Sequence, residues 1–190
     1  SIRRQRQMCI RDSPWLLLLL GCVVLIVAGL AIGILDTPIL RAFSLGALQG
    51  FYVLIGALAA GRFELGVFLL VLFLLFAMTG GRVLGDVRDL PYDQKTETMT
   101  IPKKYGIRWA SYFYLVNEIL AYIFGLLVYA TGLLGIGYLY CIVGVIIVGV
   151  PMSLAYVRNP SPRMGNIANM LSFGILGMLF VVGLIIGRLQ

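Results

Sequence analysis

Six long apolar segments dominate this sequence, and each is close to the length that a helix needs to cross a lipid bilayer. A membrane-spanning helix takes about 20 mostly apolar residues. The segments are Trp15–Leu35, Ala42–Ala60, Leu65–Gly81, Ile107–Thr131, Leu133–Val157 and Ile167–Arg188. Of the 190 residues, 61% are hydrophobic and only 12% are charged, whereas a soluble domain is about 45–50% apolar and about 25% charged. The sequence therefore predicts an all-α, polytopic transmembrane helix bundle with about six spans.

The net charge of +7 comes from basic residues that lie between the apolar segments. They form no stripe on a soluble face, so nucleic-acid binding is not predicted. The sequence has no His, which excludes imidazole acid–base chemistry, His metal ligands and His-containing catalytic triads. Its three Cys have no metal-binding spacing. Any chemistry therefore falls to carboxylates, a metal ion, Lys, Arg or Tyr.

The distribution of cations predicts which ends of the helices face the cytoplasm. The loops after the first, third and fifth spans share one side of the membrane. They carry nine cations, namely Arg41, Arg82, Arg88, Lys95, Lys103, Lys104, Arg108, Arg158 and Arg163. Cytoplasmic loops are enriched in Lys and Arg. The sequence therefore predicts a multi-pass protein of the cell membrane with its long polar loop, 82–106, in the cytoplasm.

The first 13 residues do not follow this trend. Their four Arg would lie on the outer side, opposite the other cations. They also lack a signal-peptide pattern, because a span longer than a signal core follows them. We expect residues 1–13 to be a foreign leader on a fragment, with a native basic tail as the alternative.

The polar segment 82–106 carries the strongest signal for chemistry. Asp86, Asp89 and Asp93 are spaced by three and four residues, which places them within about 60° of one another on a helical face. Pro91 lies inside this run and predicts a bend or the end of a helix there. Three carboxylates on one face repel one another unless a cation lies between them. Carboxylate, phosphate and water oxygens are the ligands that Mg²⁺ prefers, so a magnesium site is predicted.

Basic residues alternate with these acids and favour a diphosphate ligand. Cationic side chains beside a metal ion are the usual way to hold phosphate oxygens. The alternative is a solvated charged loop between two spans. A second candidate is Glu118, about ten residues inside the fourth span beside Asn117, because an ionisable residue at that depth is expensive. Glu118 could face a cavity and accept a proton, or it could pair with a polar neighbour.

The same segment resembles a motif of the UbiA-type membrane prenyltransferases. That motif has an Arg, then three Asp, then Thr, an aliphatic residue, Pro and Gly. The matching residues here are Arg82, Asp86, Asp89, Asp93, Thr100, Ile101, Pro102 and Gly106. The resemblance implies that residues 14–190 are the last six helices, about two thirds, of a nine-helix prenyltransferase domain. The family fold is a ring of helices around a lipid-accessible cavity that cytoplasmic loops cap.

The resemblance also implies a reaction. Family members use Mg²⁺ to transfer a prenyl group from a prenyl diphosphate to an aromatic or alcohol acceptor in lipid, quinone or pigment biosynthesis. By motif position, Asp89 and Asp93 are the magnesium ligands and Asp86 supports them. Arg82 and Lys95 are the candidates for diphosphate binding, and Glu118 is the candidate proton acceptor. Tyr112, Phe113 and Tyr114, just after the loop, could shield a carbocation or form an interfacial belt.

One departure from the family pattern affects the expected activity. The family's first aspartate motif, N-D-x-x-D, should precede the first span and is absent from this sequence. We therefore expect the prenyltransferase site to be incomplete in this chain. A cation-coupled membrane transporter and an inactive helix bundle are the alternative functions.

The TIPKKYG sequence and the last span look most like the archaeal glycerophospholipid and chlorophyll-type branches.

Overall fold

The computed structural model describes residues 14–31, 37–61, 64–93 and 99–189, and within these ranges every regular element is a helix. In chain order they are α2 (Pro14–Ala31), α3 (Pro38–Ala59), α4 (Leu65–Asp93), α5 (Ile101–Tyr105), α6 (Ile107–Ala130), α7 (Ile136–Arg158), α8 (Pro162–Met170), the π-helix η1 (Leu171–Leu176) and α9 (Gly177–Leu189). The predicted all-α fold is confirmed. The basic leader, 1–13, lies outside the described residues.

Among the described residues, five helical runs are long and apolar enough to span a membrane. They are α3, α4, α6, α7 and the continuous run Pro162–Gly187. The 18-residue α2 is a further apolar helix and corresponds to the first predicted span. Large apolar side chains cover the outside, with Ile147 66% exposed and Met178 72% exposed. So large an apolar surface would lead to aggregation in water. The chain is therefore an integral membrane protein.

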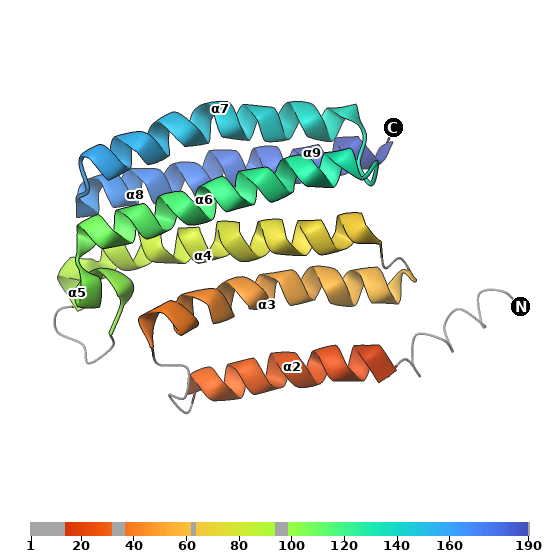
Figure 1. Ribbon diagram of the computed structural model, residues 1–190, viewed down its shortest axis with the longest axis horizontal. Coiled ribbons are helices and arrows are strands. Elements are labelled where there is room, and N and C mark those ends of the chain that lie inside the picture. The colour runs from red at the N-terminus through yellow and green to blue at the C-terminus, as the bar shows by residue number, and fades with distance from the viewer. Residues whose placement is uncertain (1–13, 32–36, 62–63, 94–98, 190) are drawn as a thin grey trace, which may run out of the picture.

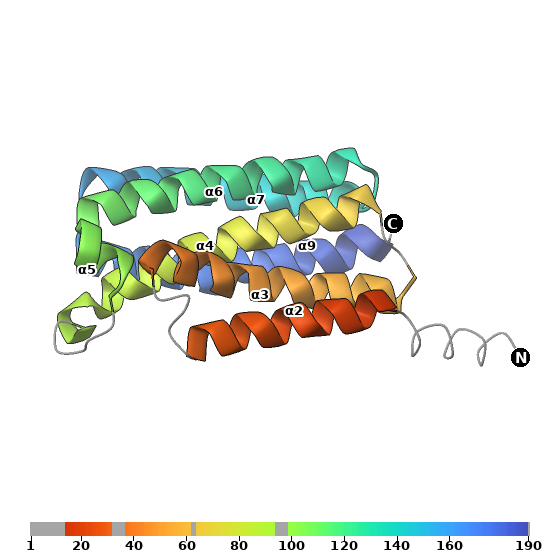
Figure 2. The same cartoon turned by 60° about the horizontal axis from the view of Figure 1, so that its bottom comes forward.

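The long helices run side by side in alternating directions, with α4 inside the bundle (Figures 1 and 2). α4 contacts α3, α5, α6 and α8. The end of α4, the short helix α5, the start of α6 and the end of α7 lie together at one end of the bundle (Figure 1). We call this the α5 end. The sequence predicted this grouping from the order of the spans.

The helix α4 is longer than its apolar run, and this corrects the predicted loop boundary. The third span was expected to end at Gly81, but α4 continues to Asp93. A helix of 29 residues is about 43 Å long, whereas the hydrocarbon layer is about 30 Å thick. The aspartates at 86, 89 and 93 therefore lie on the last turns of a helix, at the α5 end. Pro91 sits within the last turn and does not end the helix before Asp93.

The last predicted span begins earlier than expected and is interrupted in its middle. It was expected to start at Ile167 after a proline-broken loop, but helix α8 starts at Pro162. Ser161 caps this helix, because its side-chain oxygen accepts a hydrogen bond from the Met164 backbone N–H at 3.2 Å. Ser has this preference for the position before a helix, and Pro suits the first turn. The π-helix η1 then inserts an extra residue per turn between α8 and α9.

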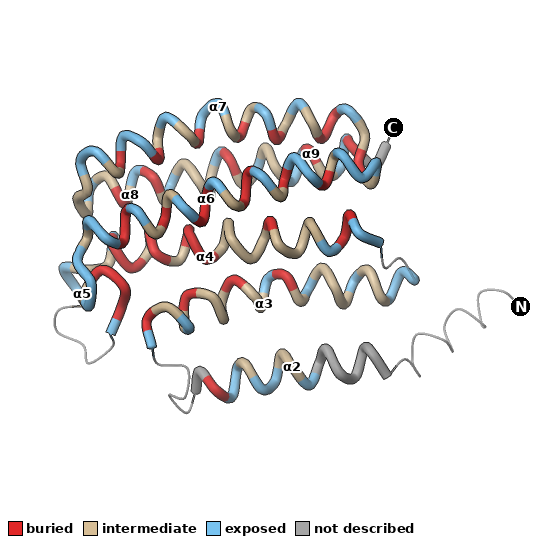
Figure 3. The backbone as a smooth tube through the Cα atoms, in the orientation of Figure 1, coloured by how far each residue is buried: buried red, intermediate tan, exposed pale blue. Residues whose placement is uncertain are grey.

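Two clusters of buried apolar residues fill the bundle. The first lies toward the α5 end and contains Ala42, Val83, Leu84, Val87, Ile101, Ala110, Tyr114, Tyr156 and Ala168. The second lies toward the other end and contains Phe73, Ala121, Tyr122, Val128, Leu134, Tyr138, Ile142, Val145 and Leu176. Figure 3 shows the buried positions recurring along the helices, on the sides that face their neighbours. Along their helices, Glu118, Ser153 and Ser172 lie between residues of the first cluster and residues of the second.

Close packing of α3 on α4 depends on a glycine, which leads to a first prediction. A Cβ on Gly46 would lie 2.5 Å from the Leu75 carbonyl oxygen and would also overlap the Thr79 hydroxyl. A backbone oxygen cannot rotate away, so the two helices would have to separate. We expect Gly46→Ala to lower the free energy of unfolding by about 1–3 kcal/mol, measured by thermal unfolding in detergent.

The matched control is Gly56→Ala on the same helix, because a Cβ there would meet no atom within 4 Å. In a helix, Ala is about 1 kcal/mol more favourable than Gly. Gly56→Ala should therefore be neutral or stabilising. Equal unfolding temperatures for the two variants would contradict the close approach of α3 to α4.

Candidate active site

Arg82, Asp86, Asp89 and Asp93 form a charged face on the last turns of α4, and Asp86 is the central residue of this charged face. It is only 7% exposed, and its Oδ1 lies 3.1 Å from the Arg82 guanidinium one turn earlier on the same helix. Arg41, at the start of α3, also attracts Asp86 electrostatically. A buried carboxylate requires such partners, because taking a charge out of water is expensive. The sequence predicted Asp86 and Arg82 but did not single out Arg41.

The Arg82 guanidinium has donors left over after it binds Asp86. Its Nε is buried and has no hydrogen-bond partner among the described residues, although the side chain as a whole is 39% exposed. A guanidinium has five N–H donors in a fixed fork that matches phosphate oxygens. An unpaired buried donor carries a free-energy cost that a ligand can remove. The geometry of Arg82 therefore suits the predicted role of binding an anion.

The other two aspartates have different surroundings. Asp89 accepts two hydrogen bonds from Arg88, at 2.7 Å from Nε and 2.8 Å from Nη2. The Asp93 backbone carbonyl accepts a hydrogen bond from the Lys103 ammonium at 3.1 Å, which ties α5 to the end of α4. Among the described residues, no three His, Cys, Asp or Glu side chains gather as a ready metal-binding group. The assignment of the three aspartates to one metal ion stays a prediction.

The donor set nevertheless fits a magnesium ion. Asp89 and Asp93 each repel Asp86 electrostatically, so negative charge is concentrated on this face of α4. Mg²⁺ usually takes only one or two protein carboxylates and completes its shell with phosphate oxygens and water. A closed group of three side chains is therefore not required. The predicted diphosphate ligand Lys95 lies outside the described residues.

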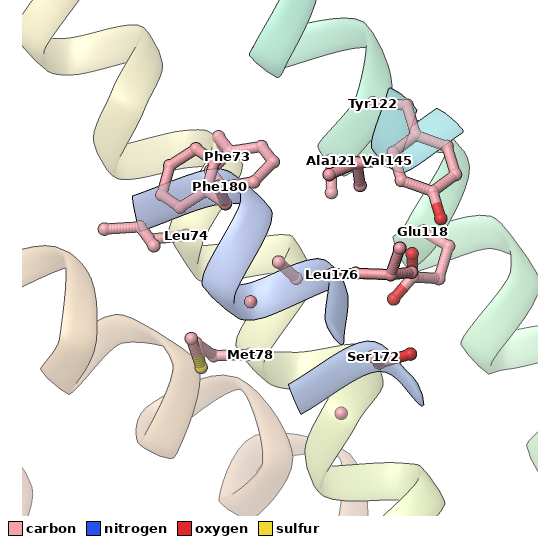
Figure 4. A pocket seen from close by; sticks show the side chains of 13 residues that line it. Phe73, Leu74, Met78, Glu118, Ala121, Tyr122, Val145, Ser172, Leu176 and Phe180 are labelled. Carbon is pink, nitrogen blue, oxygen red and sulfur yellow. The ribbon is translucent and has the colours of Figure 1, made fainter. Parts of the chain in front are cut away.

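A cavity lies inside the bundle. Its volume is about 90 Å³, and it lies between α4, α6, α7, η1 and α9 (Figure 4). The lining residues are Phe73, Leu74, Ala77, Met78, Gly81, Glu118, Ala121, Tyr122, Val145, Ser172, Leu176, Gly177 and Phe180. Phe73 and Phe180 stack at 4.4 Å and form an aromatic wall. Gly81 is the last residue of α4 that lines the cavity, and it directly precedes Arg82 in the chain.

Glu118 is part of the cavity wall, as one of the two interpretations of its position predicted. It is 6% exposed. A Cβ on Gly80 would lie 3.6 Å from Glu118 Oε1, so this carboxyl is level with Gly80 in α4. Asp86 is six residues farther along α4, which corresponds to about 9 Å. The carboxyl of Glu118 therefore lies about 9 Å deeper in the bundle than the charged face.

Two further groups in the cavity wall were not predicted from the sequence. Ser172 comes from η1, and Tyr122 comes from the next turn of α6 after Glu118. The Tyr122 hydroxyl lies toward Glu118 (Figure 4) but forms no hydrogen bond of good geometry within the described part of the chain. The spacing of Glu118 and Tyr122 by four residues on one helix was the only sequence signal for this pair.

The aromatic residues after the polar loop do not act as one group. Tyr112 is 48% exposed and Tyr114 is fully buried. Phe113 lies between Phe43 and Trp109, with ring centroids at 5.9 Å and 5.4 Å. None of the three lines the cavity. Tyr112 therefore suits an interfacial belt, and Tyr114 is part of the interior.

Comparison with known proteins adds sequence and structural relatives. No protein-family profile matches the chain. The chain is 33% identical over 108 residues to the digeranylgeranylglyceryl phosphate synthase of Methanosarcina mazei, a region that covers 56% of this chain and 37% of that protein. It is also similar to a solved structure of digeranylgeranylglyceryl phosphate synthase, with a TM-score of 0.85, 22% identity and coverage of 96% of this chain. The chain has the fold of a membrane prenyltransferase.

These relatives confirm the resemblance to the UbiA-type membrane prenyltransferases. The chain spans 37% of the length of the curated prenyltransferase and 64% of the solved one. The structural likeness covers 96% of this chain, and the expected bounds of the domain, 14–190, stay a prediction. The roles of individual residues in prenyl transfer stay predictions.

Proposed function

We propose that the protein transfers a prenyl group from a prenyl diphosphate to an alcohol acceptor within the membrane, with Mg²⁺ as cofactor. The observation that carries this proposal is the order of two kinds of surface along α4. The charged face, with the buried Asp86 and the partly exposed Arg82, begins directly after the part of α4 that lines a mainly apolar cavity. A prenyl diphosphate has the same division, with an anionic head and an apolar tail.

The proposed reaction replaces one carbon–oxygen bond with another and moves one proton from the acceptor hydroxyl to Glu118. The acceptor oxygen bonds to C1 of the prenyl group, the bond between C1 and the diphosphate oxygen breaks, and the acceptor loses its hydroxyl proton. The products are an ether and diphosphate. Negative charge grows on the departing diphosphate, so groups that stabilise this charge lower the barrier. A magnesium ion held by Asp89 and Asp93, with Asp86 beside them, supplies much of that stabilisation when it is bound.

The chain's own residues have separate roles in this proposal. Arg82 binds diphosphate oxygens through the donors that Asp86 leaves free, and Lys95, two residues after the end of α4 in the sequence, assists. Glu118 accepts the proton of the acceptor hydroxyl, which then passes to the released diphosphate or to water. Its depth of about 9 Å below Asp86 suits this role, because the acceptor must reach C1 from the side of the cavity. The apolar wall with Phe73 and Phe180 contacts the few atoms of the prenyl chain next to C1 and excludes water there.

The relatives favour an alcohol over an aromatic acceptor. The name digeranylgeranylglyceryl phosphate synthase describes a product with two geranylgeranyl groups on a glyceryl phosphate. We infer the same class of substrate for this chain, with a geranylgeranyl donor and a glyceryl phosphate lipid as acceptor. We also place the α5 end in the cytoplasm, since the predicted cation-rich connections belong to this end.

Release of diphosphate from a prenyl diphosphate tests this function. The full-length protein in lipid nanodiscs should release diphosphate from geranylgeranyl diphosphate only when a glyceryl phosphate lipid and Mg²⁺ are both present. Addition of EDTA should abolish release, and Mg²⁺ in excess should restore it, because the carboxylates of α4 need a cation to hold the diphosphate.

An aromatic acceptor in place of the glyceryl phosphate lipid is the matched control and should give little or no product. Ion uptake into vesicles without diphosphate release would overturn the proposal and favour the transporter alternative. Diphosphate release that EDTA does not reduce would overturn the proposed role of Mg²⁺ but not the proposed prenyl transfer.

A further inference from the structure

A layer of polar side chains crosses the interior of the bundle between the two apolar clusters. On α6, Glu118 lies between Tyr114 of the first cluster and Ala121 of the second. On α7, the buried Ser153 lies between Val145 and Tyr156, which belong to different clusters. Ser172 lies in the same way between Ala168 and Leu176. Polar groups at this depth in a membrane protein are expensive and mark functional sites.

The Tyr114 hydroxyl links Ser153 and Ser172 in a chain of hydrogen bonds that leads to the cavity. Ser153 Oγ donates to the Tyr114 hydroxyl at 3.2 Å. The Tyr114 hydroxyl lies 3.4 Å from Ser172 Oγ, and the geometry allows either atom to be the donor. In one of the two arrangements that this geometry allows, the Tyr114 proton points toward Ser172 and Ser172 Oγ is the acceptor. Ser172 then keeps its proton for a partner in the cavity that it lines.

The π-helix places Ser172 in this position. Ser172 is the second residue of η1, whose backbone turns are wider than those of an α-helix. π-Helices are rare and occur mostly as single turns inside α-helices, frequently at functional sites. Ser172 and Leu176 of this turn line the cavity together with Glu118 (Figure 4). The π-turn and the hydrogen bond to Tyr114 therefore both determine the position of the Ser172 side chain.

The polar wall of the cavity combines a donor and an acceptor. Ser172 supplies a hydroxyl proton, and Glu118 supplies carboxylate oxygens. An alcohol hydroxyl matches this pair, because its oxygen can accept one hydrogen bond while its proton is donated in another. The cavity volume of about 90 Å³ equals the liquid volume of about three water molecules. It has room for a hydroxyl and the few atoms next to it, but not for a whole lipid.

We propose that Ser172 binds the attacking oxygen of the alcohol acceptor and that Tyr114 and Ser153 position Ser172 for this contact. The inference rests on the proposed prenyl transfer. It adds a specificity-determining residue from η1 and a positioning network from α6 and α7. The competing explanation is that the three hydroxyls only link the helices, which would affect stability but not the recognition of the acceptor.

Separate kinetic constants for the two substrates distinguish these explanations. In the full-length protein in nanodiscs, Ser172→Ala should raise the KM for the alcohol acceptor about five- to tenfold, which is the effect of one lost hydrogen bond. The KM for the prenyl diphosphate should stay within about twofold of that of the unchanged protein. Ser172→Thr keeps the hydroxyl and should restore most of the acceptor affinity. Tyr114→Phe should raise the acceptor KM less than Ser172→Ala.

The matched control for Tyr114→Phe is Tyr156→Phe. The Tyr156 ring packs on the Tyr114 ring at 5.8 Å, and its buried hydroxyl has no hydrogen-bond partner among the described residues. Its removal should leave both KM values unchanged. An unchanged acceptor KM in Ser172→Ala, with a lowered unfolding temperature, would overturn the inference while prenyl transfer by the unchanged protein still supports the proposed function. Absence of transfer in the unchanged protein would overturn the proposed function itself.

Discussion

Replacement of Asp89 or Asp93 by Ala is expected to lower Mg²⁺-dependent diphosphate release by at least about a hundredfold, while the protein still inserts and folds. Both residues lie on the last turns of α4, at the α5 end. Loss of a metal ligand, or of a group that stabilises developing charge, has effects of about this size. Diphosphate release at several Mg²⁺ concentrations measures the effect.

Two control variants separate loss of the metal site from other effects of charge. Glu64→Ala removes an exposed carboxylate at the opposite end of the bundle and should leave turnover unchanged. Arg88→Ala is needed because Asp89 accepts two hydrogen bonds from Arg88, so Asp89→Ala also releases a cation. Exposed ion pairs contribute little to stability, and Arg88→Ala should have at most a small effect. Undiminished turnover in Asp89→Ala and Asp93→Ala would remove these residues from the metal site.

The helices were predictable because each depends on local sequence alone. A run of about 20 apolar residues has no stable place except a bilayer or a large core, and this chain is too short for such a core. The end of the third span was less certain, since polarity begins at Arg82 while the helix continues to Asp93. Helical hydrogen bonds do not depend on lipid, so a change in polarity does not end a helix.

The residues of the charged face could be predicted from the sequence, but the partners of its carboxylates could be predicted only in part. Spacings of three and four residues place Asp86, Asp89 and Asp93 on one face only if the segment is helical, and it is helical in α4. The partners of these carboxylates could not be predicted to the same degree. Arg82 is one turn away on the same helix, whereas Arg41 comes from α3, which is far away in the sequence.

The polar layer was largely invisible in the sequence. Ser153 and Ser172 are isolated small polar residues within apolar spans, and such residues also serve to let helices pack closely. Only the meeting of α6, α7 and η1 makes them partners of Tyr114. The π-turn has no sequence signature in this chain that separates it from an ordinary helical turn. The candidate acceptor site can therefore be recognised only in the tertiary structure, whereas the candidate metal site could be predicted from the spacing of residues in the sequence.

Glu118→Gln is expected to lower kcat for prenyl transfer by about 10²–10⁴, the usual contribution of a general base. Gln has nearly the same size as Glu and can still accept a hydrogen bond, but it cannot take up the proton of the acceptor hydroxyl. The KM for the prenyl diphosphate should change little, since Glu118 lies about 9 Å deeper than Asp86. Single-turnover kinetics with the alcohol acceptor separate the chemical step from product release.

The neighbouring Asn117 provides the control for Glu118, and it also decides between the two roles that the sequence left open. Asn117 is equally buried, but its side-chain nitrogen donates to the Phe113 carbonyl oxygen at 2.8 Å within α6. Asn117→Ala should therefore lower stability by about 1 kcal/mol and leave kcat nearly unchanged. If Glu118 serves only as a structural partner, Glu118→Gln will resemble Asn117→Ala, with a lower unfolding temperature and intact kcat. A large loss of kcat in Glu118→Gln alone, without loss of stability, requires a chemical role for the carboxylate.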